Sequence, residues 1–393
     1  MPASTCRSDT PATIGDFVKY CIRCLQPDTR PGIRFDEGGV CPACNYHASL
    51  SEVDWDERRQ ELEEIVAFGR MHSHSGYDCI IGVSGGKDST RQALFVKDVL
   101  KMNPLLVNLS YPPQQVTKRG VNNVANMISH GFDCISINPA PGIWRTLMRK
   151  GFFEHTNWCK STEFALYSSV PRLAIAYQIP LIWWGENTAL QLGDLNVLGK
   201  TGADGNNLRK MNTLGGGEIT WLLDDVIKTN KVLQYAYPSK DEMEQADLRI
   251  TFLGYFWKDW SLVDNGNYSA LRGLDVRRDP PWEIGDSVGV TALDEDWVTL
   301  NQMIKYLKFG FGRVTDYINE DIRNGRITRQ KGIELVKSYD GTCAPRYIES
   351  FCAYIGISVD DFWQQIDKSV NPELFEKEGL GRYRPRFKIG AGL

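Results

Sequence analysis

Four cysteines near the start of the chain have the type and spacing of a metal site. Cys21, Cys24, Cys41 and Cys44 form two C-x2-C pairs separated by 16 residues. Each pair directs two thiolates to one point, so that two pairs complete a closed tetrahedral shell of four sulfurs. A closed shell predicts a structural ion, because no coordination position is left for a substrate. Zinc is the expected metal; iron also accepts four sulfurs, and unrelated buried thiols are the remaining alternative.

A second segment has the composition of an anion-binding loop. Residues 84–89 read SGGKDS; they follow a short apolar run at 79–83 and open a stretch with a helical pattern. Gly85 and Gly86 let the backbone approach a phosphate closely, and amides at the start of a helix point at the anion. The other members of the loop add two hydroxyl donors, a positive charge and an expected magnesium ligand: Ser84, Ser89, Lys87 and Asp88.

This loop is not a Walker A motif, which has glycine where Ile81 stands and Ser or Thr in place of Asp88. It resembles the pyrophosphate loop (PP-loop) of the ATP pyrophosphatase superfamily. Members of that superfamily cleave ATP between the α and β phosphates, hold pyrophosphate in the loop and transfer AMP to a substrate oxygen. The resemblance implies ATP and Mg²⁺ as cofactors. It also implies an α/β fold with an open, parallel, five-stranded sheet of Rossmann-like, HUP type, and ATP at the carboxyl edge of the strands.

Two polar residues follow the fourth apolar run of the chain. Glu186 and Asn187 come directly after residues 180–185, PLIWWG, and in related enzymes this strand end lies near the α-phosphate and the attacked carbon. Glu186 is expected to bind magnesium or orient the nucleophile, and Asn187 to bind phosphate or the oxyanion. With Lys87 and Asp88 they form the predicted catalytic set. The alternative interpretation is that Glu186 and Asn187 only cap a helix just beyond a buried strand and have no catalytic role.

Over most of its length the chain resembles the N-acetyl sugar amidotransferases of bacterial surface-glycan biosynthesis. The resemblance is carried by the cysteine pairs, the SGGKDS loop, TKRGVNN at 117–123, PLIWWGEN at 180–187 and KFGFGRVTDYINEDIRNG at 308–325. Members amidate an acetamido group on a sugar of lipopolysaccharide O antigen, or on a nonulosonic acid of flagellin glycans, and so form an acetamidino group. The resemblance implies a nucleotide-linked N-acetyl sugar as substrate. It also implies a separate glutaminase that delivers ammonia, with a partner pair like that of imidazole-glycerol-phosphate synthase.

The residues are consistent with that chemistry. An amide oxygen is a poor leaving group, so AMP transfer to it gives an O-adenylyl imidate, which ammonia attacks to release AMP. The chain shows no glutaminase pattern of its own, because the cysteines outside the two pairs lack neighbouring His and Glu partners: Cys6, Cys79, Cys134, Cys159, Cys343 and Cys352. Cys159 is expected in a loop, with a core thiol as the simpler interpretation.

Charged residues gather at a helix junction within residues 308–325. The glycines of this segment allow a close backbone approach, and Lys and Arg side chains hold carboxylates or phosphates. The expected substrate-binding residues are Lys308, Arg313, Asp316 and Arg323. An ion-paired helix junction is the alternative interpretation.

The segments that must position these residues alternate between continuous apolar runs and helical patterns, which predicts a parallel sheet covered on both faces. Strands are expected at 79–83, 104–109, 132–137, 180–184 and 248–257, and helices between them at 89–101, 117–130 and 163–178. The glycine-rich segment 193–217 is too long for a plain connection and is expected to be a lid or an insertion. Further helices are expected at 52–70, 297–309, 314–323, 328–338, 345–355 and 359–369.

These patterns divide the 393 residues into a loose tail, a zinc ribbon, a connecting helix, a PP-loop domain and a C-terminal helical domain, at 1–15, 16–50, 51–75, 76–293 and 294–393. The basic end, 381–393, is expected to be a solvated tail.

Composition narrows the function classes. Lys and Arg number 45 against 49 Asp and Glu, a net charge of −4, which argues against a nucleic-acid binder. No apolar run reaches the ~18 residues of a membrane span, and the start of the chain lacks a secretory pattern, so a cytoplasmic location is expected. Two alternatives remain. One is a PP-loop tRNA-thiolation enzyme, although no C-x2-C pair follows Cys44; the other is a non-catalytic ATP-binding subunit, against which the intact loop argues.

Overall fold

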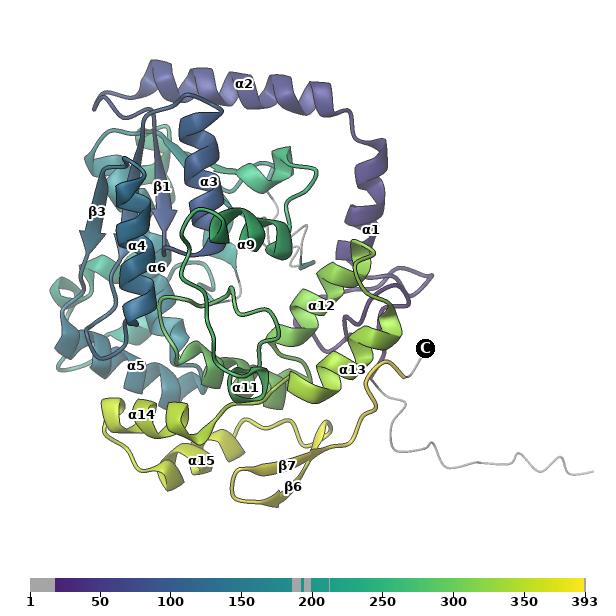
Figure 1. The fold of residues 1–393 in the computed structure, drawn as a ribbon. Helices are drawn as coiled ribbons and strands as arrows, with labels where there is room; N and C mark the ends of the chain where they lie inside the picture. Colours follow the sequence, from purple (N-terminus) through teal and green to yellow (C-terminus); the bar gives the residue numbers. More distant parts are fainter. Residues whose placement is uncertain (1–17, 186–191, 194–198, 212, 392–393) are drawn as a thin grey trace, which may run out of the picture.

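The computed structural model describes residues 18–185, 192–193, 199–211 and 213–391 (Figure 1). The predicted catalytic residues Glu186 and Asn187 lie outside the described residues, as do the predicted tail at 1–15 and parts of the glycine-rich segment.

Five strands form one all-parallel sheet in the order β3-β2-β1-β4-β5. They are β1 Cys79–Val83, β2 Pro104–Leu109, β3 Cys134–Ile137, β4 Leu181–Trp184 and β5 Arg249–Phe252. All five predicted strands are confirmed. The fifth is shorter than predicted, because a 3-10 helix, η7 (Leu253–Phe256), begins where it ends.

Successive residues of the strands enter two separate cores, which explains why the strand sequences are continuously apolar. Ile80 and Ile182 face a core formed with α5 (Pro141–His155) and α6 (Cys159–Ala176). Ile81 and Trp183 face a core formed with α2 (Trp55–His72) and α3 (Lys87–Asp98). The helix α4 (Lys118–Ser129) lies between β2 and β3 in the chain, as predicted.

Two helices differ from the sequence-based expectation. The helix α5 was not predicted, because Gly142 and Gly151 interrupt its apolar pattern, although Pro141 at its first turn is a typical helix start. The helix α6 begins four residues earlier than predicted, so that Cys159 is its first residue and not part of a loop. The Cys159 thiol is buried, and its placement agrees with the core interpretation.

The helix directions decide which residues meet at the carboxyl edge of the sheet. Because α3 follows β1, its first residue lies at that edge. Because α6 leads into β4, its last residue approaches the opposite edge and its first residues lie at the carboxyl edge. Tyr167 of α6 stacks on Trp184 at the end of β4, with ring centroids 5.4 Å apart. The SGGKDS loop and the start of α6 therefore lie at the same, carboxyl edge of the sheet.

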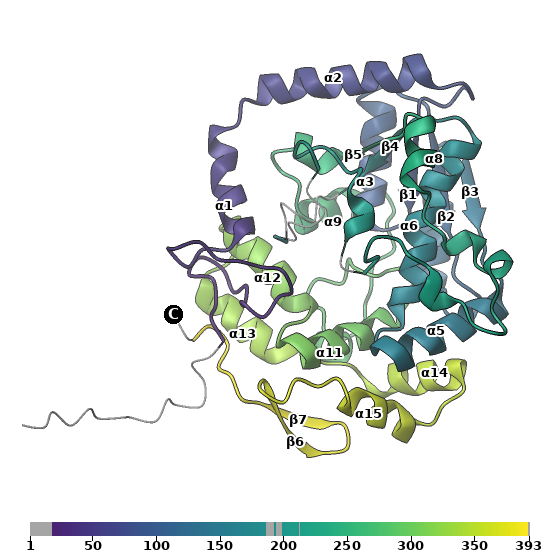
Figure 2. The same ribbon diagram turned by 180° about the vertical axis from the view of Figure 1, so that it is seen from behind.

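The N-terminal segment forms an arm that reaches from one side of the molecule to the sheet. The cysteine-bearing segment continues into α1 (Pro42–Ser49) and η1 (Leu50–Glu52), and then into α2, which crosses to the sheet (Figures 1 and 2). Asp54 caps α2 by accepting bonds from the backbone amides of Asp56 and Glu57. The predicted connecting helix is confirmed.

The segments between β4 and α11 contain short elements. Residues Ala203 and Gly205 lie along β5, where the Ala203 carbonyl accepts from Phe252 N and Gly205 N donates to the Ile250 carbonyl. The short elements are η3 Leu208–Lys210, η4 Thr220–Leu222, η5 Thr229–Lys231, η6 Leu233–Tyr235, α8 Lys240–Gln245, α9 Leu262–Ala270 and α10 Pro281–Ile284.

Five predicted helices of the C-terminal region are confirmed: α11 Val298–Phe309, α12 Arg313–Arg323, α13 Arg329–Tyr339, α14 Pro345–Ile355 and α15 Val359–Asp367. The predicted solvated tail at 381–393 is ordered in part. Most of its described side chains are exposed or half-buried, but β7 (Arg382–Pro385) pairs with a preceding strand, β6 (Phe375–Gly379), in an antiparallel hairpin. Phe387 is buried against Phe375 with ring centroids 5.6 Å apart. Within the part of the chain that the structure describes, no helix is both long and apolar enough to span a membrane.

Candidate functional site

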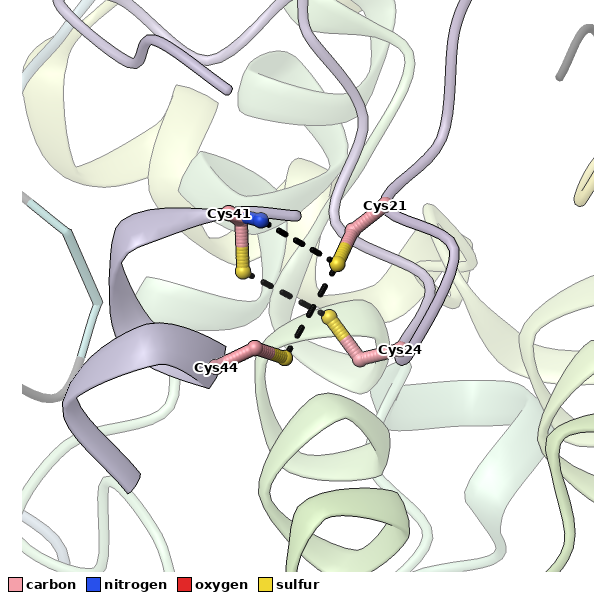
Figure 3. Close-up of side chains that lie close together, drawn as sticks. All are labelled: Cys21, Cys24, Cys41 and Cys44. Carbon is pink, nitrogen blue, oxygen red and sulfur yellow. Dashed lines mark hydrogen bonds between the residues drawn. The ribbon is translucent and has the colours of Figure 1, made fainter. Parts of the chain in front are cut away.

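The four cysteines form a compact, buried cluster (Figure 3). Their sulfur atoms all lie within 4.8 Å of one another, and the Cys21–Cys44 and Cys24–Cys41 sulfur pairs are each 3.8 Å apart. A metal–sulfur distance of about 2.3 Å gives a tetrahedron with edges of about 3.8 Å. The cluster therefore fits a zinc ion, and as predicted it leaves no open position.

The cluster is fixed by backbone amides and by the C-terminal helices. Cys41 is the residue before α1, and its amide donates to the Cys21 sulfur at 3.3 Å. The Leu25 amide donates to the Asn319 side-chain oxygen on α12 at 2.7 Å. Arg329 of α13 donates to the Cys24 carbonyl at 3.0 Å. A metal bound here would hold the N-terminal segment against α12.

The SGGKDS loop has the strand–loop–helix geometry that the sequence predicts. It leaves the end of β1 and enters α3, whose first residue is Lys87. Gly85 has a φ of +75°, and a Cβ added there would lie 2.9 Å from both the Asn123 Cβ and the Val124 backbone nitrogen. Only glycine fits this turn, which brings the loop against the middle of α4.

Side chains of α9 hold the loop from the other side. The Lys87 ammonium pairs with the Asp88 carboxylate at 2.6 Å. The other Asp88 oxygen accepts from the Asn265 amide at 2.6 Å, and the Lys87 carbonyl accepts from the Ser269 hydroxyl at 2.7 Å. Sequence analysis missed Asn265 and Ser269, because no motif links them to a loop so distant in the chain.

A cavity of about 240 Å³ lies beside the loop, over the carboxyl ends of β1, β2 and β3. Polar groups from the strand ends form one side, among them Ser84, Asn108 and Ser136. Apolar residues of α4 form the other side: Val121, Val124, Ala125 and Ile128. An aromatic ring fits against such an apolar wall. We call this space the loop cavity.

Three acidic groups have raised pKa values, and one of them, Asp294, lines the loop cavity. Burial raises the pKa of Asp294 to about 6. Burial, together with the charges of Asp294 and Asp296, raises the pKa of Glu295 to about 8. Burial raises the pKa of Glu163 to about 7, against a hydrogen bond with Thr213 that lowers it. Perturbed groups of this kind are typical of functional sites. Sequence analysis missed all three acids, since single carboxylates carry no spacing signal.

The structure does not bring the four predicted substrate-binding residues into one set. Lys308 donates to the carbonyls of His155 and Thr156 at 2.7 and 3.0 Å. Arg313 is buried, where its guanidinium donates to the Thr291 hydroxyl at 3.2 Å. Each is therefore held by partners within the protein.

Asp316 and Arg323 are the other two predicted residues, and both lie on α12. Asp316 pairs with Arg30 and, at 2.7 Å, with Lys305; burial raises its pKa, but these two cations lower it by more. Burial lowers the pKa of Arg323, and the nearby charges of Cys24 and of other groups raise it by more. The alternative interpretation of this segment, an ion-paired helix junction, therefore accounts for Asp316.

Glu320 of α12 is close enough to the SGGKDS loop to be affected by the charges of that loop. Its carboxylate accepts from the Leu262 amide at 2.8 Å, and the charges of Lys87 and Asp88 act on it. Burial raises the pKa of Glu320, and the Lys87 charge opposes that rise. Sequence analysis singled out the motif around this residue but not Glu320 itself.

Two comparisons with known proteins bear on this arrangement. Residues 290–388 match the family model "LPS biosynthesis protein WbpG-like, C-terminal domain". A segment of 111 residues, 28% of this chain, is 26% identical to "Uncharacterized protein MJ1599" of Methanocaldococcus jannaschii and covers 39% of that protein. The family match indicates a role in the biosynthesis of surface polysaccharide.

Proposed function

We propose that the protein is an ATP-dependent, AMP-forming amidotransferase that converts the acetamido group of an N-acetylated, nucleotide-linked sugar into an acetamidino group. The observation that carries the proposal is the SGGKDS loop, which joins β1 to α3 beside the loop cavity at the carboxyl edge of a parallel sheet. The WbpG-like match supports the polysaccharide context.

The geometry gives ATP a natural orientation. In open parallel sheets, ligands bind beyond the carboxyl ends of the strands where the strand order reverses, which here is between β1 and β4. The β and γ phosphates would meet the backbone of Gly85 and Gly86 and the first amides of α3. The adenine would lie in the loop cavity, against the apolar face of α4. The α-phosphate would then lie near the end of β4, which leads to Glu186.

The proposed reaction has two steps. The acetamido oxygen attacks the α-phosphorus of ATP, and the bond to the bridging oxygen breaks to release pyrophosphate. Ammonia then adds to the imidate carbon, loses a proton, and AMP leaves as the carbon–oxygen bond breaks, which gives the amidine. Lys87 would neutralise the leaving pyrophosphate, and Ser84 and Ser89 would donate to it. Asp88, Glu186 and Asn187 keep the roles that the sequence predicts for them.

Magnesium and zinc have separate places in this proposal. The Asp88 carboxylate, held by Lys87 and Asn265, would ligate Mg²⁺, which supplies positive charge at the phosphates. Zinc would be structural, because its four sulfur ligands are buried and leave no open position. A separate glutaminase would supply ammonia, and a reaction that consumes ATP fits the cytoplasm.

Pyrophosphate release measures the proposed reaction. Candidate N-acetyl sugars and bulk tRNA would be incubated with ATP, Mg²⁺ and the protein, with and without ammonium. We expect release with a sugar acceptor, and an acetamidino product only with ammonium. Release that requires tRNA would instead support the thiolation alternative. ATP binding without turnover with any acceptor would support a non-catalytic subunit.

A further inference from the structure

A second cavity lies between the start of α6, the N-terminal segment and α11. Its volume is about 510 Å³, within the range of about 300–1,000 Å³ that is common for small-molecule sites. We call it the lysine cavity, after Lys160 of α6 and Lys305 and Lys308 of α11, which line it. The loop cavity does not include any of these residues.

The lysine cavity borders the same edge of the sheet as the loop cavity. Glu163, one turn beyond Lys160 on α6, lines the lysine cavity. Tyr111 lines the loop cavity. Lys160 and Glu163 lie on the first turns of α6, at the carboxyl edge, and Tyr111 follows the carboxyl end of β2. The two cavities therefore border the same edge of the sheet, a suitable arrangement for two reactants.

Two of the lysines carry charge that the described part of the chain does not neutralise. Lys305 shares Asp316 with Arg30. By contrast, no carboxylate among the described residues lies within ion-pair distance of Lys160 or Lys308. Burial and the nearby charge of Lys160 lower the pKa of Lys308 to about 8. An anion between the two ammonium groups would relieve this repulsion.

Three residues that line this space also have buried polar atoms without partners among the described residues. The His155 Nε2, Asn157 Oδ1 and Gln302 Oε1 atoms are buried and lack a hydrogen-bond partner within the described ranges. All three residues line the lysine cavity. Unpaired buried polar atoms are costly, so a ligand that hydrogen-bonds to them is expected. Glu163 is the only carboxyl among the described lining residues, and burial raises its pKa to about 7, so that it opposes an anion only in part.

We propose that the lysine cavity is the acceptor site, where Lys160 and Lys308 bind an anionic group of the N-acetyl sugar. This inference rests on the proposed function. The anionic group is a phosphate of a nucleotide sugar or a carboxylate of an acidic sugar; both are oxyanions that ammonium groups bind. A neutral sugar would leave the two positive charges unpaired. The unpartnered atoms of His155, Asn157 and Gln302 would hydrogen-bond to sugar hydroxyls.

Calorimetric titration of the full-length, zinc-loaded protein tests this site. The probes are UDP-N-acetylglucosamine, N-acetylneuraminate and neutral N-acetylglucosamine. We expect at least one anionic probe to bind about tenfold or more tightly than the neutral sugar. Lys160→Met and Lys308→Met should each weaken that binding about tenfold or more. The exposed Lys331→Met of α13 is the control with the same loss of charge and should bind like the wild type.

The two lysine variants differ in structural risk. Lys308 donates to two carbonyls, so its variant can lose stability. The Lys160 side chain has no hydrogen bond or ion pair with the described residues and only faces the Trp221 ring, 5.7 Å from its centroid, so Lys160→Met tests binding with less structural change. Preference for the nucleotide sugar would identify the anion as phosphate, and preference for N-acetylneuraminate would identify it as carboxylate.

Three outcomes would overturn the inference: no binding of either anionic probe, equal binding of the neutral sugar, or unchanged affinity in Lys160→Met. Anion binding that depends on the lysines, without pyrophosphate release for any acceptor, would keep the site and reject the proposed function. Amidine formation with an unchanged acceptor KM in Lys160→Met would keep the function and reject the site.

Discussion

Lys87 and Asp88 are the residues on which the proposed chemistry depends most. Both lie at the start of α3, where the helix amides and the lysine charge point to one anion. We expect Lys87→Ala and Asp88→Ala to lower AMP formation by about 100-fold or more, since charge stabilisation at a transition state has that order of effect. Circular dichroism should show an intact fold. Turnover near that of the wild type in either variant would exclude the phosphate role of the loop.

Glu295 ties the stability of the protein to pH. Its folded-state pKa, about 8, lies above its ordinary value of 4.5, so the folded state binds this proton more tightly than the unfolded state. The contribution of this proton to the free energy of unfolding is fully present below pH 4.5 and is lost as the pH rises through about 8. Glu295→Gln cannot ionise, and should be more stable than the wild type at pH 9 by about 1–3 kcal/mol but not at pH 5.

Thermal melts of both proteins across pH 5–9 measure this difference. The control is Glu334→Gln, an exposed position on α13. If wild type and Glu295→Gln lose stability in parallel as the pH rises, the Glu295 carboxyl does not carry the proton assigned to it.

At the scale of elements, the turn between β1 and α3 depends on one glycine. Gly85→Ala combines a positive φ with a Cβ only 2.9 Å from atoms of α4. We expect it to lower the free energy of unfolding by about 1–3 kcal/mol and to weaken ATP binding. Gly142→Ala in α5 is the matched control, because a Cβ there meets nothing within 4 Å. Equal effects of the two substitutions in melting and nucleotide titration would contradict the close approach.

The strands could be predicted from the sequence, while much of the candidate site could not. β1, β2 and β4 are buried on both faces, so their sequences are almost entirely apolar, with Asn108 of β2 the polar exception. The SGGKDS loop is recognisable because it directly follows the apolar run of β1. The loop is also local in sequence. The lysine cavity joins Lys160 to Lys308 through the packing of α6 near α11, and neither residue belongs to a local motif that records this meeting. Phe387 was missed for the same reason.

The ribbon and α12 form one connected structure, because the Leu25 amide and the Cys24 carbonyl bond to α12 and α13. We expect about one zinc per chain. Cys24→Ser should lower that content and make the N-terminal segment sensitive to protease, while the sheet domain stays folded, since structural zinc supplies folding free energy directly. Metal analysis and limited proteolysis measure this, with Cys343→Ser as the control. Full zinc content in a Cys21→Ser, Cys24→Ser double variant would refute the site.

At the scale of the whole molecule, the proposal requires a source of ammonia. Cys159 is buried at the start of α6, and burial together with the nearby Glu163 raises its pKa, so its thiol is a poor nucleophile. Free ammonia is scarce near neutral pH, and water at an imidate would regenerate the amide and waste ATP. A partner that delivers ammonia directly to the carboxyl edge of the sheet avoids both losses.

We therefore expect the protein to form amidine from ammonium alone, but from glutamine only when a glutaminase partner is added. Mass spectrometry of the product, with glutamine labelled at its amide nitrogen, measures the transfer. A catalytically inactive glutaminase variant is the control, because it keeps the docking contact and removes the ammonia. With the active partner, excess unlabelled ammonium should dilute the label little if ammonia is delivered directly, and strongly if it first escapes to solvent. Labelled product from this chain alone, free of contaminating glutaminase, would show that it contains a glutaminase site after all.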